Sequence, residues 1–364
     1  MLRFGNLLSR KTELSLNFET CEFFPRPLFS RTIPNGKFFK WAAYLDKYFL
    51  FPRQLNRKLK HYKNSIDLVH VVDHSNAIYL PKIKKISTAK LLVTCHDLIA
   101  VRTALGEFPS APNTSPTGKR LQGWIRSSLN FADHYSCDSN QTKNDLNRLI
   151  PKSTSTSSVI HLGTEPKPAP QHSISSTNKK LPFDPNKTDF ILHVGSSAWY
   201  KNRKAVFRSF VDAHEKNISL NLKLVLVGPE PQSHELDHKV CMWISNNKSS
   251  IIRIDALAEE SLYKLYQNAK VLIFPSHIEG FGWPPLEAAL CGCPVITTHS
   301  GAIHELLGSY PKYVDSTDQN TINRRVLESL QSNSHKCLRI NLPNGDQCRK
   351  NYYELYERML DKNS

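Results

Sequence analysis

Short β-branched apolar runs alternate along the chain with longer segments in which apolar residues recur at helical spacing. This alternation is typical of parallel sheets with helices packed on both faces. We expect strands in the first half at 66–72, 91–94, 134–138 and 159–162. In the second half we expect them at 190–194, 222–227, 251–254, 271–274, 295–297 and 313–314. The pattern predicts an α/β fold of two Rossmann-like, doubly wound parallel-sheet domains that face each other across a cleft.

A break in the pattern separates the two series of elements. The stretch 164–187 is rich in Pro, Ser and Lys and has no apolar periodicity, which is typical of a linker. A chain of 364 residues also exceeds the usual size of one hydrophobic core. We therefore assign a first domain to 1–168, a linker to 169–187, a second domain to 188–345, and a C-terminal helix that crosses back to the first domain to 346–364.

The composition favours a folded cytoplasmic protein. Apolar residues make up 40% and charged residues 22% of the chain, which is unlike the composition of disordered chains. The N-terminus lacks an apolar signal-peptide core, and no stretch approaches the ~20 apolar residues that cross a bilayer. The eight cysteines are scattered without a C-x-x-C pair or a zinc-ligand spacing, so we expect reduced thiols.

The formal charge of +16 calls for a partner such as nucleic acid, anionic lipid or a phosphate-bearing substrate. In the segment 31–63, nine Lys and Arg face one acid, Asp46, and aromatic residues recur at roughly helical spacing. Such a segment is typical of a helix on an anionic membrane surface. A core-facing aromatic stripe with a solvated basic face is the second interpretation. Specific nucleic-acid binding has only the charge in its favour, because no recognition motif is present.

The candidate chemistry is densest after the run VLIF, in PSHIEGFGWPPLEAALCGCPVITT. Seven residues lie between Glu279 and Glu287, and two glycines among them would let backbone amides approach a ligand. Two prolines suit a first helical turn. We place Glu287 in that turn, where it could accept two hydroxyl hydrogen bonds of about 1.5–3 kcal/mol each. The alternative is an acid that complements the helix dipole and glycines that only form a turn.

A second candidate site precedes the helix that follows FILHV. Lys201, Arg203 and Lys204 lie in or before its first turn, where the helix dipole disfavours cations. A bound diphosphate would reverse that effect. Lys201 is our main candidate, whereas we expect Arg203 and Lys204 to point into solvent.

A third candidate lies in the first half, where the run KLLVTC ends at His96 and Asp97. Asp97 is expected to cap the following helix. A lone histidine such as His96 is by default a core residue with satisfied hydrogen bonds, and the alternative is a functional side chain.

These motifs resemble the GT-B fold retaining glycosyltransferases known as group 1 or family 4. The resemblance is carried by the phrase from Glu279 to Glu287, and it continues in the His-Asp pair at 96–97, in CDSNQTKNDL at 137–146, and in GAIHEL at 301–306, where Glu305 matches a family acid. It implies catalytic roles for His96, Lys201 and Glu279. It also implies substrate-binding roles for Asp97, Gly195, Ser196, Arg203, Gly280, Phe281, Gly282 and Glu287.

In detail, the resemblance implies that Glu279 and the amides after it hold the donor sugar, and that Glu287 holds the nucleotide ribose. Lys201 would contact the diphosphate. The family often has an arginine where this chain has Ser196, so Arg203 would supply part of the phosphate clamp. The implied reaction transfers a hexose, such as mannose or glucose, from a nucleotide diphosphate sugar to a glycan or lipid-linked acceptor. No cofactor is expected, and the absence of a D-x-D motif predicts that no metal is used.

One departure from the family concerns the start of the chain. Family members open with a strand of the MRILLV type and a glycine-rich loop, whereas this sequence opens with MLRFGNLLSR. We therefore expect the first domain to lack its first βα unit, together with amides that would face the departing diphosphate. The rival hypothesis is an inactive or truncated relative that binds only nucleotide sugar or a membrane.

Overall fold

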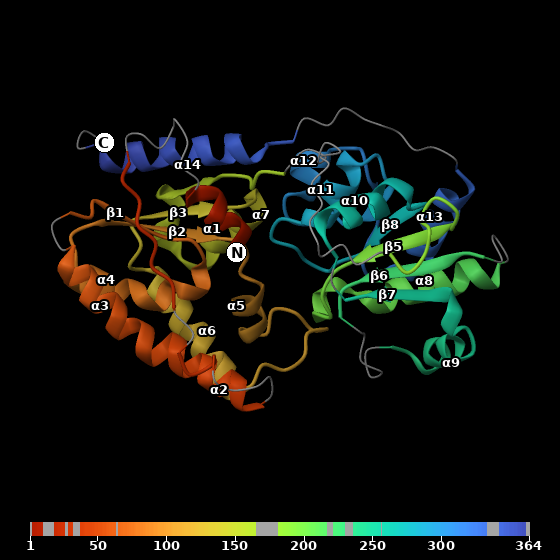
Figure 1. Cartoon of the computed structure of the whole chain (residues 1–364), viewed down its shortest axis with the longest axis horizontal. Helices are drawn as coiled ribbons and strands as arrows, with labels where there is room; N and C mark the ends of the chain where they lie inside the picture. Colours follow the sequence, from red (N-terminus) through yellow and green to blue (C-terminus); the bar gives the residue numbers. More distant parts are fainter. Residues whose placement is uncertain are drawn as a thin grey trace.

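The computed structural model describes residues 2–9, 18–25, 28–31, 37–62, 65–164, 181–216, 221–229, 236–255, 257–332 and 342–361. In these residues, two parallel sheets form the centres of two lobes that lie side by side (Figure 1). The predicted α/β fold class, with two doubly wound parallel sheets, is confirmed. The domain limits and the linker at 169–187 stay predictions, because most of the linker lies outside the described residues.

The first sheet has four parallel strands in the order β1-β2-β3-β4. They span Leu68–Val71, Lys90–Cys95, His134–Cys137 and Ser157–Val159. The last strand lies earlier than the predicted 159–162, because its ladder with β3 ends at Val159. Ile160 and Leu162 are instead buried in a hydrophobic cluster that includes residues of the second lobe.

Helices of the first lobe pack against this sheet. They are α4 (Leu80–Ile86), α5 (Ile99–Ala104), α6 (Pro116–Leu129) and α7 (Asn140–Leu149), with short 3-10 turns η3 (His74–Tyr79) and η4 (Pro151–Ser155). Their apolar faces bury Leu91, Val93 and Tyr135 in one core cluster. Burial of this kind stabilises the fold by roughly 25 cal/mol for each Å² of apolar surface. The alternating apolar positions therefore hold the sheet against its helices.

The basic segment near the N-terminus forms three consecutive helical pieces. They are α2 (Lys37–Leu45), the π-helical η2 (Asp46–Leu50) and α3 (Phe51–His61). Leu55 and Leu59 of α3 are buried in the core of the first lobe. In contrast, Trp41 is 71% exposed and Phe49 is 54% exposed, as are about half of Tyr44 and Leu45. The expectation of a core-facing aromatic stripe is therefore wrong for these residues, because the leucines of α3 face the core in their place.

The second sheet has six parallel strands in the order β10-β9-β8-β5-β6-β7. In chain order the strands are Phe190–Val194, Lys223–Val227, Ile251–Ile254, Val271–Phe274, Val295–Thr297 and Lys312–Tyr313. Strands β5 and β8 pair at the centre, which is where the strand order reverses. In doubly wound sheets this switch point is where loops at the carboxyl ends diverge and leave room for a ligand.

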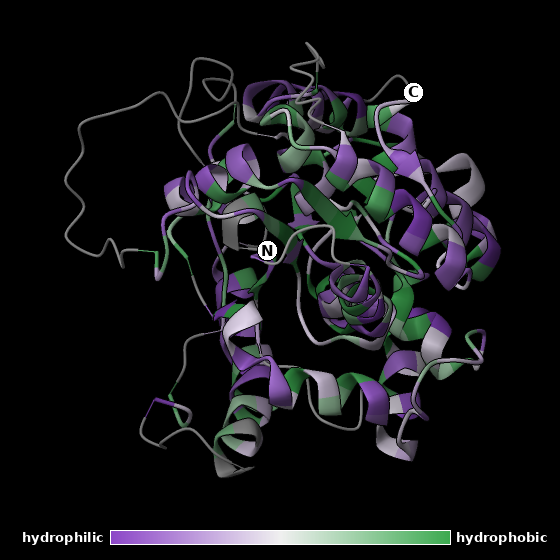
Figure 2. Ribbon diagram, turned by 90° about the vertical axis from the view of Figure 1, so that its right-hand side faces the viewer, coloured by the Kyte–Doolittle hydropathy of each residue, from purple (hydrophilic) through white to green (hydrophobic). Residues whose placement is uncertain are grey.

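The helices of the second lobe are α8 (Arg203–Glu215), α9 (His238–Asn246), α10 (Glu259–Asn268), α11 (Trp283–Leu290), α12 (Ile303–Leu307) and α13 (Gln319–Gln331). Short 3-10 turns precede α8 and β7, at η5 (Trp199–Lys201) and η7 (Lys248–Ser250). Hydrophobic residues gather on the strands and the inward helix faces, and the outer surfaces are mainly hydrophilic (Figure 2).

The last helix, α14 (Gly345–Leu360), lies along the first lobe (Figure 1). Its Tyr352 hydroxyl accepts a hydrogen bond from Ser136 Oγ at 2.9 Å and lies 3.1 Å from Thr94 Oγ1. The N-terminal helix α1 (Leu2–Ser9) contacts α14, and its Phe4 is buried against Tyr352. Both chain ends thus pack on the first sheet. No helix among the described residues is long and apolar enough to cross a membrane.

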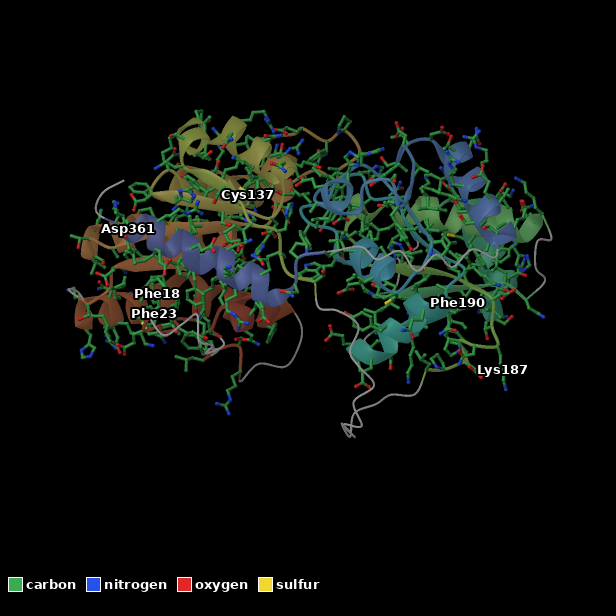
Figure 3. All side chains as sticks on the ribbon, turned by 90° about the horizontal axis from the view of Figure 1, so that it is seen from above. Phe18, Phe23, Cys137, Lys187, Phe190 and Asp361 are labelled. Atoms are coloured by element: carbon green, nitrogen blue, oxygen red, sulfur yellow. The ribbon has the colours of Figure 1, made fainter. Side chains whose placement is uncertain are left out.

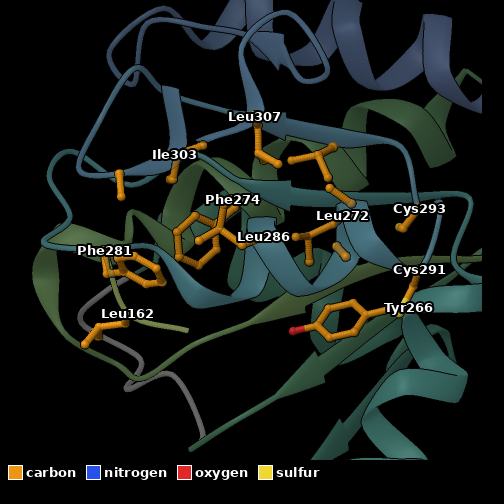
Figure 4. Packing of buried hydrophobic residues seen from close by; sticks show 14 of the residues in the cluster. Leu162, Tyr266, Leu272, Phe274, Phe281, Leu286, Cys291, Cys293, Ile303 and Leu307 are labelled. Atoms are coloured by element: carbon orange, nitrogen blue, oxygen red, sulfur yellow. The ribbon is translucent and has the colours of Figure 1, made fainter. Parts of the chain in front are cut away.

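The two lobes touch through specific contacts as well as through apolar packing. Side chains fill the region between the two ribbons (Figure 3). Gly301 N–H of the second lobe donates to Gln141 Oε1 of the first at 2.6 Å. Leu162 of the first lobe shares a hydrophobic cluster with Phe281 of the second and lies beside it (Figure 4). The structure therefore describes a closed arrangement of the lobes.

Candidate functional site

The site is built on the loops that follow the central strands β5 and β8 of the second sheet. Lys201 comes after β5 and Glu279 after β8, and the two side chains form an ion pair. Lys201 Nζ lies 2.8 Å from Glu279 Oε1 and 3.0 Å from Oε2. Their side chains are only 13% and 7% exposed. Two residues that the sequence assigned separately are thus joined in one buried pair.

The pair sits in an environment that disfavours an isolated charge. Burial raises the pKa of the Glu279 carboxyl, and the ammonium of Lys201 offsets part of that shift. Lys201 Nζ also lies 4.8 Å from the centroid of the Phe274 ring, at a distance where a cation is attracted to an aromatic face. The Lys201 ammonium is thus held between the Glu279 carboxylate and the face of an aromatic ring.

Backbone geometry at the start of α8 fixes the position of Lys201. The next residue, Asn202, has a left-handed backbone with φ of 50°. Its side-chain amide donates to the carbonyl oxygens of Pro275 at 3.1 Å and Ser316 at 2.8 Å. These two bonds compensate a conformation that is costly for a residue with a side chain. They also tie the loop after β5 to the loop after β8.

The neighbouring residues of this loop differ in exposure. Gly195 N–H donates to Val227 O at 3.0 Å, and Ser196 is exposed. Arg203 is 4% exposed and donates to Pro229 O at 2.6 Å. The expectation that Arg203 points into solvent is therefore wrong, because its guanidinium ties the helix start to the loop after β6. Lys204 is 43% exposed and pairs with Asp237.

The glycines after Glu279 are required by close packing between segments. A Cβ atom on Gly280 would lie 2.1 Å from the carbonyl oxygen of His96, which belongs to the first lobe. Gly282 has a φ of +89°, and a Cβ there would lie 2.5 Å from Ile303 Cγ1. Only glycine fits both positions without displacing a neighbour. The backbone cradle predicted from the sequence is thus also the point where the two lobes meet.

The side chain of Phe281 turns away from this loop into the hydrophobic cluster. It is 5% exposed, and its ring centroid lies 5.0 Å from that of Trp283. Figure 4 shows it in a row of buried side chains with Phe274 and Leu286. Phe281 could therefore meet a ligand only through its backbone.

Glu287 lies deeper in helix α11 than the sequence suggested. The helix begins at Trp283, after the left-handed Gly282, so Glu287 is its fifth residue and lies beyond the first turn. The prediction of a first-turn position is therefore wrong. Glu287 is 8% exposed, and its Oε2 accepts a hydrogen bond from the Tyr266 hydroxyl at 3.1 Å. Two buried acids thus follow β8 within one loop and helix.

His96 of the first lobe lies on the other side of the Gly280 contact. Its Nδ1 is 2.7 Å from Asp138 Oδ2, and its Nε2 is 2.9 Å from Val72 O. The Phe4 ring meets it edge-on, with ring centroids 5.3 Å apart. His96 is 16% exposed, so it is neither fully in the core nor open to solvent.

Asp97 does not cap helix α5 as expected, because the N-cap residue is Leu98. Its Oδ1 nevertheless accepts a hydrogen bond from Ile99 N–H at 3.0 Å, so the carboxylate still satisfies an amide of the first turn. Asp97 therefore makes a capping hydrogen bond, although it lies one residue before the N-cap position.

Two residues that the sequence did not single out belong to the site. Asp138 follows β3 directly, and its carboxylate holds His96. A signal for it existed, because Cys95 and Cys137 pair in register, so the residues after them leave neighbouring strands at the same sheet edge. Tyr266, which holds Glu287, comes from the face of α10 and carried no comparable signal.

Glu305 of the second lobe makes a further contact with the first lobe. Its Oε1 accepts from Asn140 N–H at 2.8 Å, and its Oε2 lies 2.9 Å from His161 Nε2. Burial raises the pKa of Glu305, but the hydrogen bonds from His161 and Asn140 outweigh it, so the pKa is lowered overall. Among the described residues, no group of three or more His, Cys, Asp or Glu side chains is arranged to hold a metal ion.

Two family profiles match the two halves of the chain. The family described as glycosyl transferases group 1 matches residues 175–341, and the family described as glycosyltransferase family 4 matches residues 19–167. The first match contains Lys201, Glu279 and Glu287, and the second contains His96. The matched regions thus meet at the contact between Gly280 and His96.

Relatives with assigned names share parts of the chain. The sequence is 38% identical over 76 residues to O-antigen chain mannosyltransferase B of Escherichia coli, which covers 21% of this chain and 20% of that protein. It is 31% identical over 146 residues to an O-antigen chain mannosyltransferase of Salmonella typhimurium, covering 37% of this chain and 39% of that protein. The chain therefore matches well under half the length of these relatives.

Solved structures share the fold over most of the chain. Sucrose-phosphate synthase from Thermosynechococcus elongatus superposes with a TM-score of 0.63 at 19% identity, covering 86% of this chain and 79% of that one. A UDP-forming alpha,alpha-trehalose-phosphate synthase from Burkholderia xenovorans gives a TM-score of 0.60 at 11% identity, covering 91% and 80%. At these identities the likeness concerns the fold alone.

Proposed function

This chain belongs to the glycosyltransferases of group 1, and we propose that it transfers a hexose from a nucleotide diphosphate sugar to an acceptor hydroxyl. The observation that carries the proposal is the buried Lys201–Glu279 pair, with Glu287 behind it, at the carboxyl ends of the central strands β5 and β8. This edge is where doubly wound sheets bind nucleotides.

The leaving diphosphate would be met by charges that are already in position. The ammonium of Lys201 lies in the turn before α8. The N-terminus of that helix would add further donors for an anion. Such preorganised donors stabilise negative charge as it develops and need no reorganisation during the reaction. We therefore propose that the reaction needs neither a metal ion nor a cofactor.

The sugar and the ribose would be held by the two buried acids. We propose that Glu279 and the backbone amides that follow it, as far as Gly282, bind the donor sugar. Glu287 would bind the ribose hydroxyls. A buried carboxylate binds hydroxyl groups strongly, because each charge-assisted hydrogen bond contributes about 1.5–3 kcal/mol. Tyr266 orients Glu287 for this purpose by donating to one of its oxygens.

The acceptor would approach from the first lobe, on the side of His96. We propose transfer with retention, in which the acceptor hydroxyl attacks the face that the diphosphate leaves, and a diphosphate oxygen takes its proton. No enzyme nucleophile takes part in this step. Closure of the lobes, supported by the Glu305 and Gly301 contacts, would exclude water that could hydrolyse the donor.

The names of the relatives favour mannose as the sugar, with glucose as the alternative, and a glycan or lipid-linked acceptor. The exposed aromatic residues of α2 and η2 support a peripheral position on the cytoplasmic face of a membrane. Trp41 and Phe49 are more than half exposed, and the Arg53 guanidinium lies 3.7 Å from the centroid of the Phe49 ring. Exposed aromatics with adjacent cations suit an anionic lipid interface.

One observation favours a second candidate, a relative that binds nucleotide sugar or a membrane without transferring the sugar. Phe4 of α1 packs against His96 and Tyr352, where the acceptor would approach. Both ring nitrogens of His96 also face groups of the protein itself. In this candidate the second lobe binds a nucleotide sugar and no glycosidic bond forms.

Binding and turnover can be tested separately. Thermal shift with UDP-glucose, GDP-mannose and related nucleotide sugars identifies the donor, and calorimetry then compares Glu287→Ala with Glu357→Ala, an exposed acid of α14. We expect the first variant to lose at least tenfold in affinity and the second to bind as the parent does. Equal affinities in both variants would remove Glu287 from the site. Binding without release of nucleoside diphosphate in the presence of membrane extract would favour the second candidate.

A further inference from the structure

We infer that His96 and Asp138 together hold one proton more than a neutral imidazole and an ionised carboxylate would. While the pair keeps this proton, His96 meets a substrate oxygen as a hydrogen-bond donor through Nε2 and does not act as a general base. Asp138 is in this view a positioning residue. Its effect on a substrate rests on the proposed function, whereas the state of the His96–Asp138 pair does not.

The hydrogen-bond geometry requires two protons on the pair. The oxygen that faces Nε2, Val72 O, is a carbonyl that can only accept, so Nε2 must carry a proton to make this 2.9 Å contact. At 2.7 Å, Nδ1 and Asp138 Oδ2 need a second proton between them. A neutral histidine beside an ionised aspartate has one proton too few. The pair therefore holds a proton that an isolated histidine, with a pKa near 6.5, would give up at neutral pH.

The surrounding charges support this state. Burial lowers the pKa of His96, but the charge and hydrogen bond of Asp138 and the charge of Asp73 outweigh it, so the pKa is raised overall. Burial keeps His70, the other imidazole nearby, neutral by lowering its pKa to about 3. Asp97 from the same loop adds negative charge to the Asp138 site. The charges of Asp73 and Asp97 thus favour the protonated form of the pair, whereas the charge of His74 lowers the pKa of Asp138.

Asp138 itself is committed to this task. It is 1% exposed, and its second oxygen, Oδ1, has no hydrogen-bond partner among the described residues. A buried carboxylate oxygen without a partner is costly, so the contact of Oδ2 with His96 must compensate for it. Removing the charge while keeping the shape should therefore change the protonation of His96 more than it changes the fold.

The backbone of His96 touches the loop that would hold the sugar. The carbonyl of His96 abuts Gly280, directly after Glu279. A ligand oxygen placed in this loop could replace Val72 O as the acceptor of the Nε2 proton. Loss of the pair's extra proton would leave Nε2 bare and remove the donor. In this proposal the affinity for a nucleotide sugar depends on the protonation of a residue in the opposite lobe.

The variant Asp138→Asn separates this account from a merely structural one. An asparagine amide can donate to Nδ1 while Nε2 keeps its proton toward Val72 O, so a neutral His96 satisfies every bond. Asp67→Asn, the same change at an exposed position before β1, is the matched control. Thermal unfolding and circular dichroism check that each variant folds.

The first measurement is nitrogen-15 NMR of the histidine rings, with His96 assigned by the variant His96→Gln. We expect Nε2 of the parent protein and of Asp67→Asn to be protonated at pH 7 and to lose its proton well above pH 6.5. In Asp138→Asn, Nε2 should stay protonated to high pH, and Nδ1 should titrate below 6.5. A bare Nε2 in the parent at pH 7, or the same titration in Asp138→Asn and the parent, would overturn the inference.

The second measurement is the affinity for the nucleotide sugar that gives the largest thermal shift, at pH 6 and pH 9. The parent should bind about tenfold more weakly at pH 9, the effect of one lost hydrogen bond of about 1.4 kcal/mol. Asp138→Asn should change less than twofold. A parent affinity that does not change with pH would refute the link to the ligand. If no nucleotide sugar binds at all, the proposed function fails while the NMR result still decides the state of the pair.

Discussion

The two lobes each bring one buried carboxylate to their contact, and the two acids have different partners. Glu279 of the second lobe is held by Lys201, and Asp138 of the first lobe is held by His96. Both acids follow a parallel strand and are almost fully buried. The carboxylate of the second lobe is thus held by an ammonium, and that of the first lobe is held by an imidazole, a group whose protonation can change near neutral pH.

The largest effect on stability is expected from breaking the Lys201–Glu279 pair. Lys201→Met would leave the Glu279 carboxylate buried without its cation, which typically destabilises a protein by about 3–5 kcal/mol. Urea unfolding measures this loss. Because burial raises the pKa of Glu279 in the fold, the acid can take up a proton, and the loss should be smaller at pH 5 than at pH 8.

A matched double variant tests the cause of that loss. Adding Glu279→Gln to Lys201→Met removes the uncompensated charge, so most of the stability should return. If the single variant unfolds at the same urea concentration as the parent, the Lys201–Glu279 ion pair does not stabilise the fold. If the double variant is no more stable than the single one, the loss comes from packing rather than from charge.

The next largest effect concerns the contact between the lobes. Gly280→Ala would place a methyl group 2.1 Å from a backbone oxygen that cannot move aside, so the lobes must separate. Overpacking of this kind typically costs about 1–3 kcal/mol. Small-angle scattering should show a larger radius of gyration, and nucleotide-sugar affinity should fall. Gly123→Ala is the control, because no atom lies within 4 Å of its added Cβ. Identical scattering from both variants would contradict a tight contact at Gly280.

The smallest effect is expected at the membrane. Trp41→Ser should weaken binding to vesicles of anionic lipid severalfold, because it removes a side chain that is 71% exposed and free to insert. Met242→Ser, at an exposed apolar residue of the second lobe, serves as the control. Flotation with the two variants should separate them only when the vesicles carry negative charge. Equal binding of both variants would assign the exposed aromatics another role.

The second lobe could be predicted from the sequence further than the first, for a physical reason. Glu279, the glycines and Glu287 lie within one loop and helix, so local spacing brings them together. The partners His96 and Asp138 are 42 residues apart and meet only because β2 and β3 pair in register. Periodicity predicts that such strands exist, but it does not predict which strand-end residues will touch.

The same difference explains two of the misplaced residues. Arg203 was expected in solvent because local sequence shows only a helix start, whereas a carbonyl from the loop after β6 draws its guanidinium inward. Glu287 was placed in the first turn, although it is the fifth helical residue, because the start of α11 depends on the left-handed Gly282, whose close contact with Ile303 comes from a different element. Both errors arise where a contact between distant segments overrides local helix signals.

The central claim is that a nucleoside diphosphate is held by Lys201 at the end of β5. Calorimetric titration of UDP and GDP into Lys201→Gln and Lys204→Gln tests it most directly, because these neighbouring lysines differ mainly in their surroundings, one buried beside Glu279 and the other on the surface beside Asp237. Lys201→Gln should bind the preferred nucleotide at least tenfold more weakly, and Lys204→Gln should bind it within twofold of the parent. Equal affinities in the two variants would contradict the claim.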